Sequence, residues 1–145
     1  MTRTLTAAVF PLLWLVAGPQ TANGQDASNV SIFDGVFTEA QVKRGKLAYE
    51  AQCASCHGFD LISPSGAPNM VMPAFRFGWH GRTIAQKLEQ IRTTMPQGFP
   101  ESMSDQEYLE VIAYILDFNG YPAGDRELDA NQTEVLEGIV IEPLP

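Results

Sequence analysis

The chain has 145 residues, enough for one compact domain and a short processed end. Seventeen acidic side chains against nine basic ones give a net charge of −8, which argues against a nucleic-acid-binding protein. A hydrophobic content of 45% with 10% aromatic residues is typical of a packed globular domain. Two cysteines are too few for a multi-bridge disulfide scaffold or a four-cysteine iron–sulfur site.

Residues 1–24 have the pattern of a secretory signal peptide. Arg3 supplies the positive charge, and an uncharged apolar run follows over residues 7–17, interrupted by Pro11. A membrane helix needs about 20 apolar residues, so we expect no stable membrane span after processing. Cleavage after Gly24 would release a periplasmic protein, to which any cofactor is added outside the cytoplasm. An uncleaved N-terminal anchor is the alternative.

The region after the signal peptide predicts an extended lead-in and then a helix. Residues 25–37 are polar and show no sustained periodicity. Thr38 and Gln41 fit a capping box that opens a helix running to about Cys53. Gly45 inside this helix costs about 1 kcal/mol relative to alanine, which suggests that another backbone passes close to it.

Two further helices are predicted downstream of a long irregular loop. Residues 58–81 lose all periodicity but are rich in methionine and aromatic residues, so we expect this loop to wrap around something apolar. Thr83 caps a second helix with an apolar stripe. A capping box at Ser104 opens a third helix that ends near Phe118 and is apolar nearly all round, as expected for a buried helix.

Residues 121–145 form an acidic C-terminal tail, with six acidic residues and one basic residue after Gly124. Leu136, Ile139 and Ile141 would allow this tail to dock on the body of the protein. A solvated tail is the equal alternative at this point.

The motif that carries chemistry is Cys53-Ala54-Ser55-Cys56-His57. A C-x-x-C-H run is the attachment signature of a c-type haem. Two thiols separated by one tight turn can each add to a different vinyl group of one porphyrin, and the adjacent histidine then reaches the iron. We therefore predict one haem c, covalently held through Cys53 and Cys56, with His57 as an iron ligand.

Three other interpretations of this motif are weaker. A structural zinc site would need Cys53, Cys56, His57 and His80, but the adjacent Cys56 and His57 are poorly placed for one tetrahedral ion. A thioredoxin-type pair belongs in an α/β pattern, and no strand signal precedes this one. A disulfide that closes so short a loop would remove little chain entropy.

The second axial ligand must come from elsewhere in the chain, and methionine or histidine is expected. We favour Met95, because a helix carries the chain past the motif and Pro96 and Pro100 stiffen the loop that presents it. His80 is the next candidate. The remaining methionines are more simply explained as gap-filling side chains; they are Met70, Met72 and Met103. A methionine–histidine pair leaves no open coordination position and points to electron transfer.

These motifs, taken in order, resemble the class I monohaem cytochromes c over residues 38–118. The resemblance rests on Gly45-x-x-x-Tyr49-x-x-x-Cys53-x-x-Cys56-His57-Gly58, Pro73-x-Phe75, Trp79, Leu88, Thr94-Met95-Pro96 and Ala113-Tyr114-Ile115-Leu116. It implies a small all-α fold, with three to four helices around one covalently bound haem c in a domain over residues 38–120. It also implies that the first and last helices cross at Gly45 and Tyr114.

The resemblance adds three residues to the cofactor-binding set. It implies that the carbonyl of Pro73 accepts the ring N–H of His57, and that Trp79 lies near a haem propionate. Tyr49 completes the set as part of the motif before Cys53. Phe75 departs from the leucine that is common in the family.

A second, narrower resemblance is carried by Tyr114-Ile115-Leu116-Asp117-Phe118-Asn119-Gly120-Tyr121-Pro122-Ala123-Gly124, by Glu127-Leu128 and by the later Leu136/Ile139/Ile141 pattern. These residues resemble cytochromes encoded with pyrroloquinoline-quinone (PQQ) alcohol dehydrogenases. It implies a quinoprotein dehydrogenase as electron donor, with an oxidase or another cytochrome as acceptor. We therefore predict a periplasmic electron carrier and not an enzyme. The alternatives are a fixed cytochrome subunit of a dehydrogenase complex and a haem sensor or ligand-binding protein.

Overall fold

The computed structural model describes residues 30–145, so the predicted signal peptide lies outside the described residues. The regular structure of this part of the chain is helical. Its elements are the 3-10 helix η2 (Ile32–Asp34) and the helices α1 (Glu39–Gln52), α2 (Ala54–His57), α3 (Ala74–Trp79), α4 (Ile84–Thr94), α5 (Asp105–Phe118) and α6 (Thr133–Gly138). Within residues 30–145 the one strand-like pairing is a β-bridge between Thr83 and Val140. The predicted all-α fold is confirmed.

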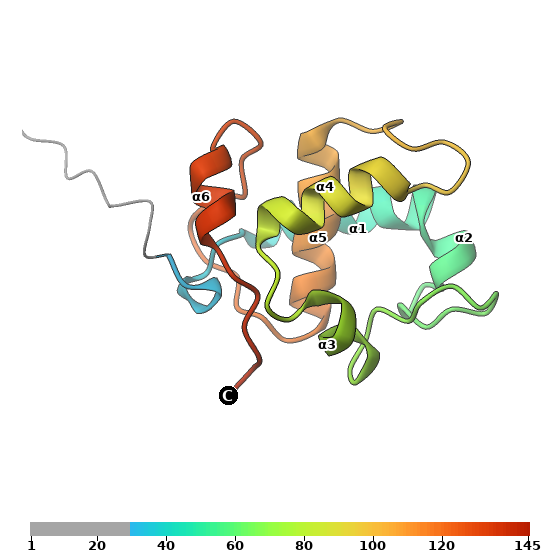
Figure 1. Ribbon diagram of the computed structural model, residues 1–145, viewed down its shortest axis with the longest axis horizontal. Coiled ribbons are helices and arrows are strands. Elements are labelled where there is room, and N and C mark those ends of the chain that lie inside the picture. The colour runs from blue at the N-terminus through green and yellow to red at the C-terminus, as the bar shows by residue number, and fades with distance from the viewer. Residues whose placement is uncertain (1–29) are drawn as a thin grey trace, which may run out of the picture.

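Helices α1 and α5 cross at the centre of the molecule (Figure 1). Gly45 makes the close approach possible, because a Cβ atom at this position would overlap the carbonyl oxygen of Glu110. One turn further along each helix, the rings of Tyr49 and Tyr114 pack 5.3 Å apart between centroids. The expectation that another backbone passes Gly45 is therefore confirmed.

The capping signals predict the helix starts correctly, with one difference. Thr83 and Ser104 both form complete capping boxes at α4 and α5. Thr38 accepts a hydrogen bond from the backbone N–H of Gln41 at 3.0 Å, but the Gln41 side chain does not reach back to Thr38. It instead pairs with both backbone groups of Leu128, at 2.8 and 3.0 Å, and is fully buried. A long-range partner has replaced the local one.

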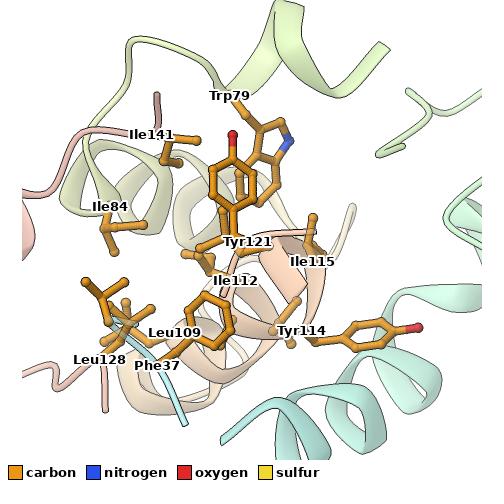
Figure 2. Packing of buried hydrophobic residues seen from close by; sticks show 14 of the residues in the cluster. Phe37, Trp79, Ile84, Leu109, Ile112, Tyr114, Ile115, Tyr121, Leu128 and Ile141 are labelled. Atoms are coloured by element: carbon orange, nitrogen blue, oxygen red, sulfur yellow. The ribbon is translucent and has the colours of Figure 1, made fainter. Parts of the chain in front are cut away.

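Helix α5 lies at the centre of the core. Figure 2 shows Trp79, Tyr121 and Phe37 lying around Ile112 of α5, whereas Tyr114 points away from them towards α1. The buried residues of α5 occupy nearly every side of the helix, as its sequence predicts; they are Tyr108, Leu109, Val111, Ile112, Ala113, Tyr114, Ile115 and Leu116.

The C-terminal segment is an integral layer of the fold. Ile139 and Ile141 are buried, and their backbones bond to the α3–α4 connection: Ile84 N–H donates to Ile139 at 3.0 Å, and Gly81 N–H donates to Ile141 at 2.9 Å. Helix α6 and helix α2 lie on opposite sides of α5 (Figure 1). Of the two alternatives for residues 121–145, the structure shows the tail docked on the body of the protein. The acidic residues of the tail therefore belong to a packed C-terminal layer.

Two short elements differ from the sequence expectations. Residues 32–34 form a 3-10 helix instead of extended chain, because Ser31 and Asp34 cap each other. Residues 74–79 form α3 inside the loop that was expected to be irregular, starting directly after Pro73. None of the helices in residues 30–145 is long and apolar enough to cross a bilayer.

Candidate functional site

The C-x-x-C-H motif forms one helical turn at the end of α1. The backbone N–H of Cys53 donates to Tyr49 at 2.8 Å, and those of Cys56 and His57 donate to Cys53 at 3.1 and 3.0 Å. Residues three and four positions apart share one face of a helix, so the two thiols and the imidazole belong to the same face. Cys53 is half-buried, Cys56 is exposed, and neither is in a disulfide.

Tyr49 fixes the far end of this turn. Its hydroxyl donates a 2.7 Å hydrogen bond to the carbonyl oxygen of Gly58, whose φ of 78° ends the helix. Burial of the ring, followed by the nearby Cys53, raises the pKa of the Tyr49 hydroxyl, so the group stays a neutral donor. Tyr49 therefore stabilises the helical turn of the motif through Gly58. Its direct contact with a cofactor stays a prediction.

Two serines that the sequence analysis missed hold the same turn from the other side. The hydroxyls of Ser63 and Ser65 donate to the carbonyl oxygen of Cys56 at 2.8 and 3.0 Å. They satisfy a carbonyl that the short helix leaves without a backbone partner. Serines in a proline- and glycine-rich loop are common, so the sequence offered no signal that singled them out.

The imidazole of His57 is oriented by Pro68 and not by Pro73. Its Nδ1 lies 3.1 Å from the carbonyl oxygen of Pro68. Since a carbonyl can only accept, Nδ1 carries the proton, and Nε2 keeps the lone pair that a metal requires. Such a bond also raises the basicity of the imidazole as a ligand.

The expectation that the Pro73 carbonyl accepts the ring N–H of His57 is therefore wrong, because the carbonyl of Pro68 takes this role. The loop after Gly58 doubles back through a hydrogen bond from Met70 N–H to the Leu61 carbonyl at 2.9 Å, and this fold-back presents Pro68 to His57. Pro73 instead occupies the N-cap position of α3. The sequence places three prolines in this loop, and only the path of the backbone distinguishes them.

Met95 lies at the C-terminal end of α4 and its backbone is held on both sides. Its N–H donates to Ile91 at 2.8 Å, and its carbonyl accepts the Tyr108 hydroxyl at 2.8 Å. The side chain is half-buried. Its role as an iron ligand stays a prediction, for which this fixed backbone is favourable.

The alternative ligand His80 is engaged elsewhere. Its Nε2 lies 3.2 Å from the hydroxyl of Tyr121, which donates its one proton to the Glu142 carbonyl at 2.6 Å. Nε2 must therefore donate to the Tyr121 oxygen and has no lone pair free for a metal. Burial, with a smaller effect of Arg76, lowers the pKa of His80.

Trp79 belongs to the core between α3 and α4. Its ring stacks on Phe75 at 4.9 Å between centroids, and the ammonium group of Lys87 lies 4.3 Å above the ring centre. The expected position of Trp79 near a haem propionate stays a prediction.

The donor set of the turn and the partly buried apolar residues of the chain fit a covalently attached haem. Apolar side chains of the loop, α4 and the α4–α5 connection pack on the core but remain only partly buried, so they offer surface for an apolar ring; they are Met70, Val71, Leu88, Ile91 and Met103. The donor set is two free thiols and one imidazole with an available Nε2. Among the described residues, no three His, Cys, Asp or Glu side chains are grouped to hold a metal ion.

The comparison with protein families agrees with this chemistry. The model of the family described as cytochrome C oxidase, cbb3-type, subunit III matches residues 40–115. These residues include α2, α3, α4 and most of α1 and α5, and they leave out the C-terminal layer. Neither the comparison with curated proteins nor the comparison with solved structures gave a match.

Proposed function

Because the chain belongs to the family described as cytochrome C oxidase, cbb3-type, subunit III, and is therefore a cytochrome c domain, we propose that it is a periplasmic one-electron carrier with one covalent haem c. The haem supplies a one-electron iron couple. The observation that carries the proposal is the arrangement of His57, whose Nδ1 is held by Pro68 so that Nε2 is available on the face that also carries both thiols.

In this proposal the residues of the chain divide the work. Cys53 and Cys56 attach the cofactor, which prevents its loss outside the cytoplasm. His57 and Met95 would hold the iron, and a thioether beside a neutral imidazole would favour the reduced state and raise the potential. Tyr49 keeps the attachment turn in shape.

The proposal includes the partners that the sequence suggested. A quinoprotein dehydrogenase is the proposed donor and an oxidase or another cytochrome the proposed acceptor. The net charge of −8 supports encounter with basic docking surfaces, and such steering weakens as salt is added. A fixed cytochrome subunit of a dehydrogenase complex is the alternative, which isolation of a free monomer would contradict.

The test of the cofactor is the pyridine haemochrome spectrum of the exported protein. Expression with its leader in a host competent for cytochrome maturation is expected to give one haem per chain, with the spectrum of a two-thioether attachment. The double variant Cys53→Ser/Cys56→Ser is expected to be colourless, whereas Ser55→Ala, between the cysteines, is expected to match the wild type. Colourless wild-type protein would contradict the proposal.

Carbon monoxide distinguishes a carrier from a sensor or ligand-binding protein. If His57 and Met95 both bind iron, the reduced protein has no open position, and its spectrum is expected to stay unchanged under carbon monoxide at neutral pH. Rapid formation of a carbonyl complex would favour the sensor alternative.

A further inference from the structure

A buried lysine lies on the core side of α4. Lys87 is 4% exposed, and its Nζ lies 2.9 Å from Gln90 Oε1, 3.3 Å from the Gly78 carbonyl oxygen and 4.3 Å from the centre of the Trp79 ring. All three neighbours are uncharged. Long cationic side chains usually bury their stem and leave the charged end in water, and Lys87 does not follow this pattern.

The ammonium group has no negative partner in the described part of the chain. Every salt bridge within residues 30–145 involves Arg44, Lys46 or Arg92, and Lys87 is in none of them. The charged group that acts on it is basic: burial first and Arg82 second lower the pKa of Lys87 to about 8. A buried charge is costly unless it is paired. The cation–π contact with Trp79 offsets only about 2 kcal/mol of that cost.

The position of Lys87 on α4 relates it to the cofactor site. Lys87 and Ile91 are four residues apart on one face of α4, and Met95 follows four residues later at the C-cap of this helix. Eight residues of helix span about 12 Å. The helix and its C-cap therefore carry, in order, a cation, a half-buried apolar residue and the proposed sulfur ligand.

A haem has a matching order of chemical groups. Its iron lies at the centre of an apolar ring, and its two propionate carboxylates lie together at one edge. We propose that Lys87 is the counter-ion of a haem propionate, held in place by Gln90, Gly78 and Trp79. This inference rests on the proposed haem, and it assigns a specific residue to the carboxylate end of the cofactor.

The pairing has a consequence for the iron that a purely structural lysine would not have. A positive charge near the ring favours the ferrous state. A paired propionate also stays ionised over a wide pH range, whereas a buried propionate without a partner takes up a proton near neutral pH. The groups that face Lys87 are Arg82 and the three uncharged neighbours, so no other carboxylate of this cluster would titrate in its place.

The experiment measures the midpoint potential of the intact haem protein from about pH 5 to about pH 9. Lys87→Met removes the charge but keeps an apolar stem over Trp79. Its redox equilibrium with a fixed mediator is expected to shift roughly tenfold towards the oxidised form and to gain a pH-dependent segment absent from the wild type. The resonance Raman bending mode of the propionates is expected to shift as well. Lys87→Arg is expected to restore both signatures.

Lys43→Met is the control, because it removes the same charge from an exposed position on α1. If Lys87→Met and Lys43→Met give the same potential, the same pH profile and the same propionate mode, the proposal is overturned. If Lys87→Met does not accumulate, the same measurements on Lys87→Gln replace it. This variant also removes the charge but keeps a hydrogen-bond donor, and the same outcomes support or overturn the proposal. A wild-type protein without haem would contradict the proposed function instead, so the two failures are distinct.

Discussion

The hydroxyl of Tyr49 donates a 2.7 Å hydrogen bond to the carbonyl oxygen of Gly58, joining the interior of α1 to the residue that ends the haem-attachment turn. Both residues are buried. Tyr49→Phe leaves this buried carbonyl with only the longer 3.3 Å hydrogen bond from the Leu61 N–H, so we expect the free energy of unfolding to fall by about 0.5–1.5 kcal/mol while the haem stays attached. Denaturant unfolding of the oxidised protein measures this loss.

Tyr114→Phe is the matched control for this change. Tyr114 packs against Tyr49 from α5, but its hydroxyl makes no hydrogen bond within residues 30–145. We expect a loss below about 0.5 kcal/mol, as for a substitution that removes no partnered group. Equal losses in the two variants would show that the Gly58 contact contributes nothing particular.

The crossing of α1 and α5 depends on the absence of a side chain at Gly45. Gly45→Ala would place a Cβ atom against the backbone of Glu110, where no side chain can rotate away. We expect the free energy of unfolding to fall by at least about 3 kcal/mol, or the protein not to accumulate. Gly78→Ala on α3 meets nothing within 4 Å and is expected to be neutral or to stabilise by up to about 1 kcal/mol. Thermal unfolding of both variants tests the contrast.

The sequence predicts the local features of this fold better than the long-range ones. Thr83 and Ser104 are followed by their capping partners three residues later, and both predicted helix starts are confirmed. Gln41 has the same local pattern, but a fully buried amide that bonds both backbone groups of Leu128 has a stronger partner than its own cap. Local patterns cannot indicate such a partner, because it lies 87 residues away in the chain.

The same distinction applies to the candidate site. The C-x-x-C-H motif is local, and its helical turn, free thiols and oriented histidine agree with the expectation. The residue that orients His57 depends on how the loop folds back through Leu61 and Met70, so the family resemblance implied Pro73 where the structure has Pro68. The burial of Lys87 depends on its contacts with Gly78 and Trp79 of the neighbouring α3, so the position of this lysine on its own helix does not indicate it.

The C-terminal layer is expected to stabilise the domain. Ile141 is fully buried and bonded through its backbone to Gly81 and Arg82, whereas the neighbouring Val140 is 38% exposed. Ile141→Ala is expected to lower the free energy of unfolding by about 2–5 kcal/mol, and Val140→Ala by less than about 1 kcal/mol. Denaturant midpoints of the two variants measure the difference. Similar small losses would mean that the acidic segment is only loosely attached.

His80 is expected to make the stability of the protein depend on pH. Its pKa lies below the ordinary 6.5 in the folded state, so the unfolded chain binds more protons between the two pKa values. The stabilising contribution is therefore complete above about pH 6.5 and is lost as the pH falls below that value. His80→Gln keeps a donor for Tyr121 and removes the titration. Between about pH 7 and about pH 5, the wild type is expected to lose more stability than this variant, and parallel curves would contradict the expectation.

Met95 provides the sharpest test of the proposed iron coordination. Met95→Ala removes the thioether but leaves the backbone bonds to Ile91 and Tyr108 possible, so the loop is expected to keep its path. Both thioether attachments should persist, while the sulfur-to-iron charge-transfer band disappears and the potential falls, because a soft ligand that favours ferrous iron is lost. Met72→Ala, at a 40% exposed methionine of the loop, is the control and is expected to keep the band. An unchanged band in Met95→Ala would exclude Met95 as the ligand, and its loss in Met72→Ala would transfer the role to Met72.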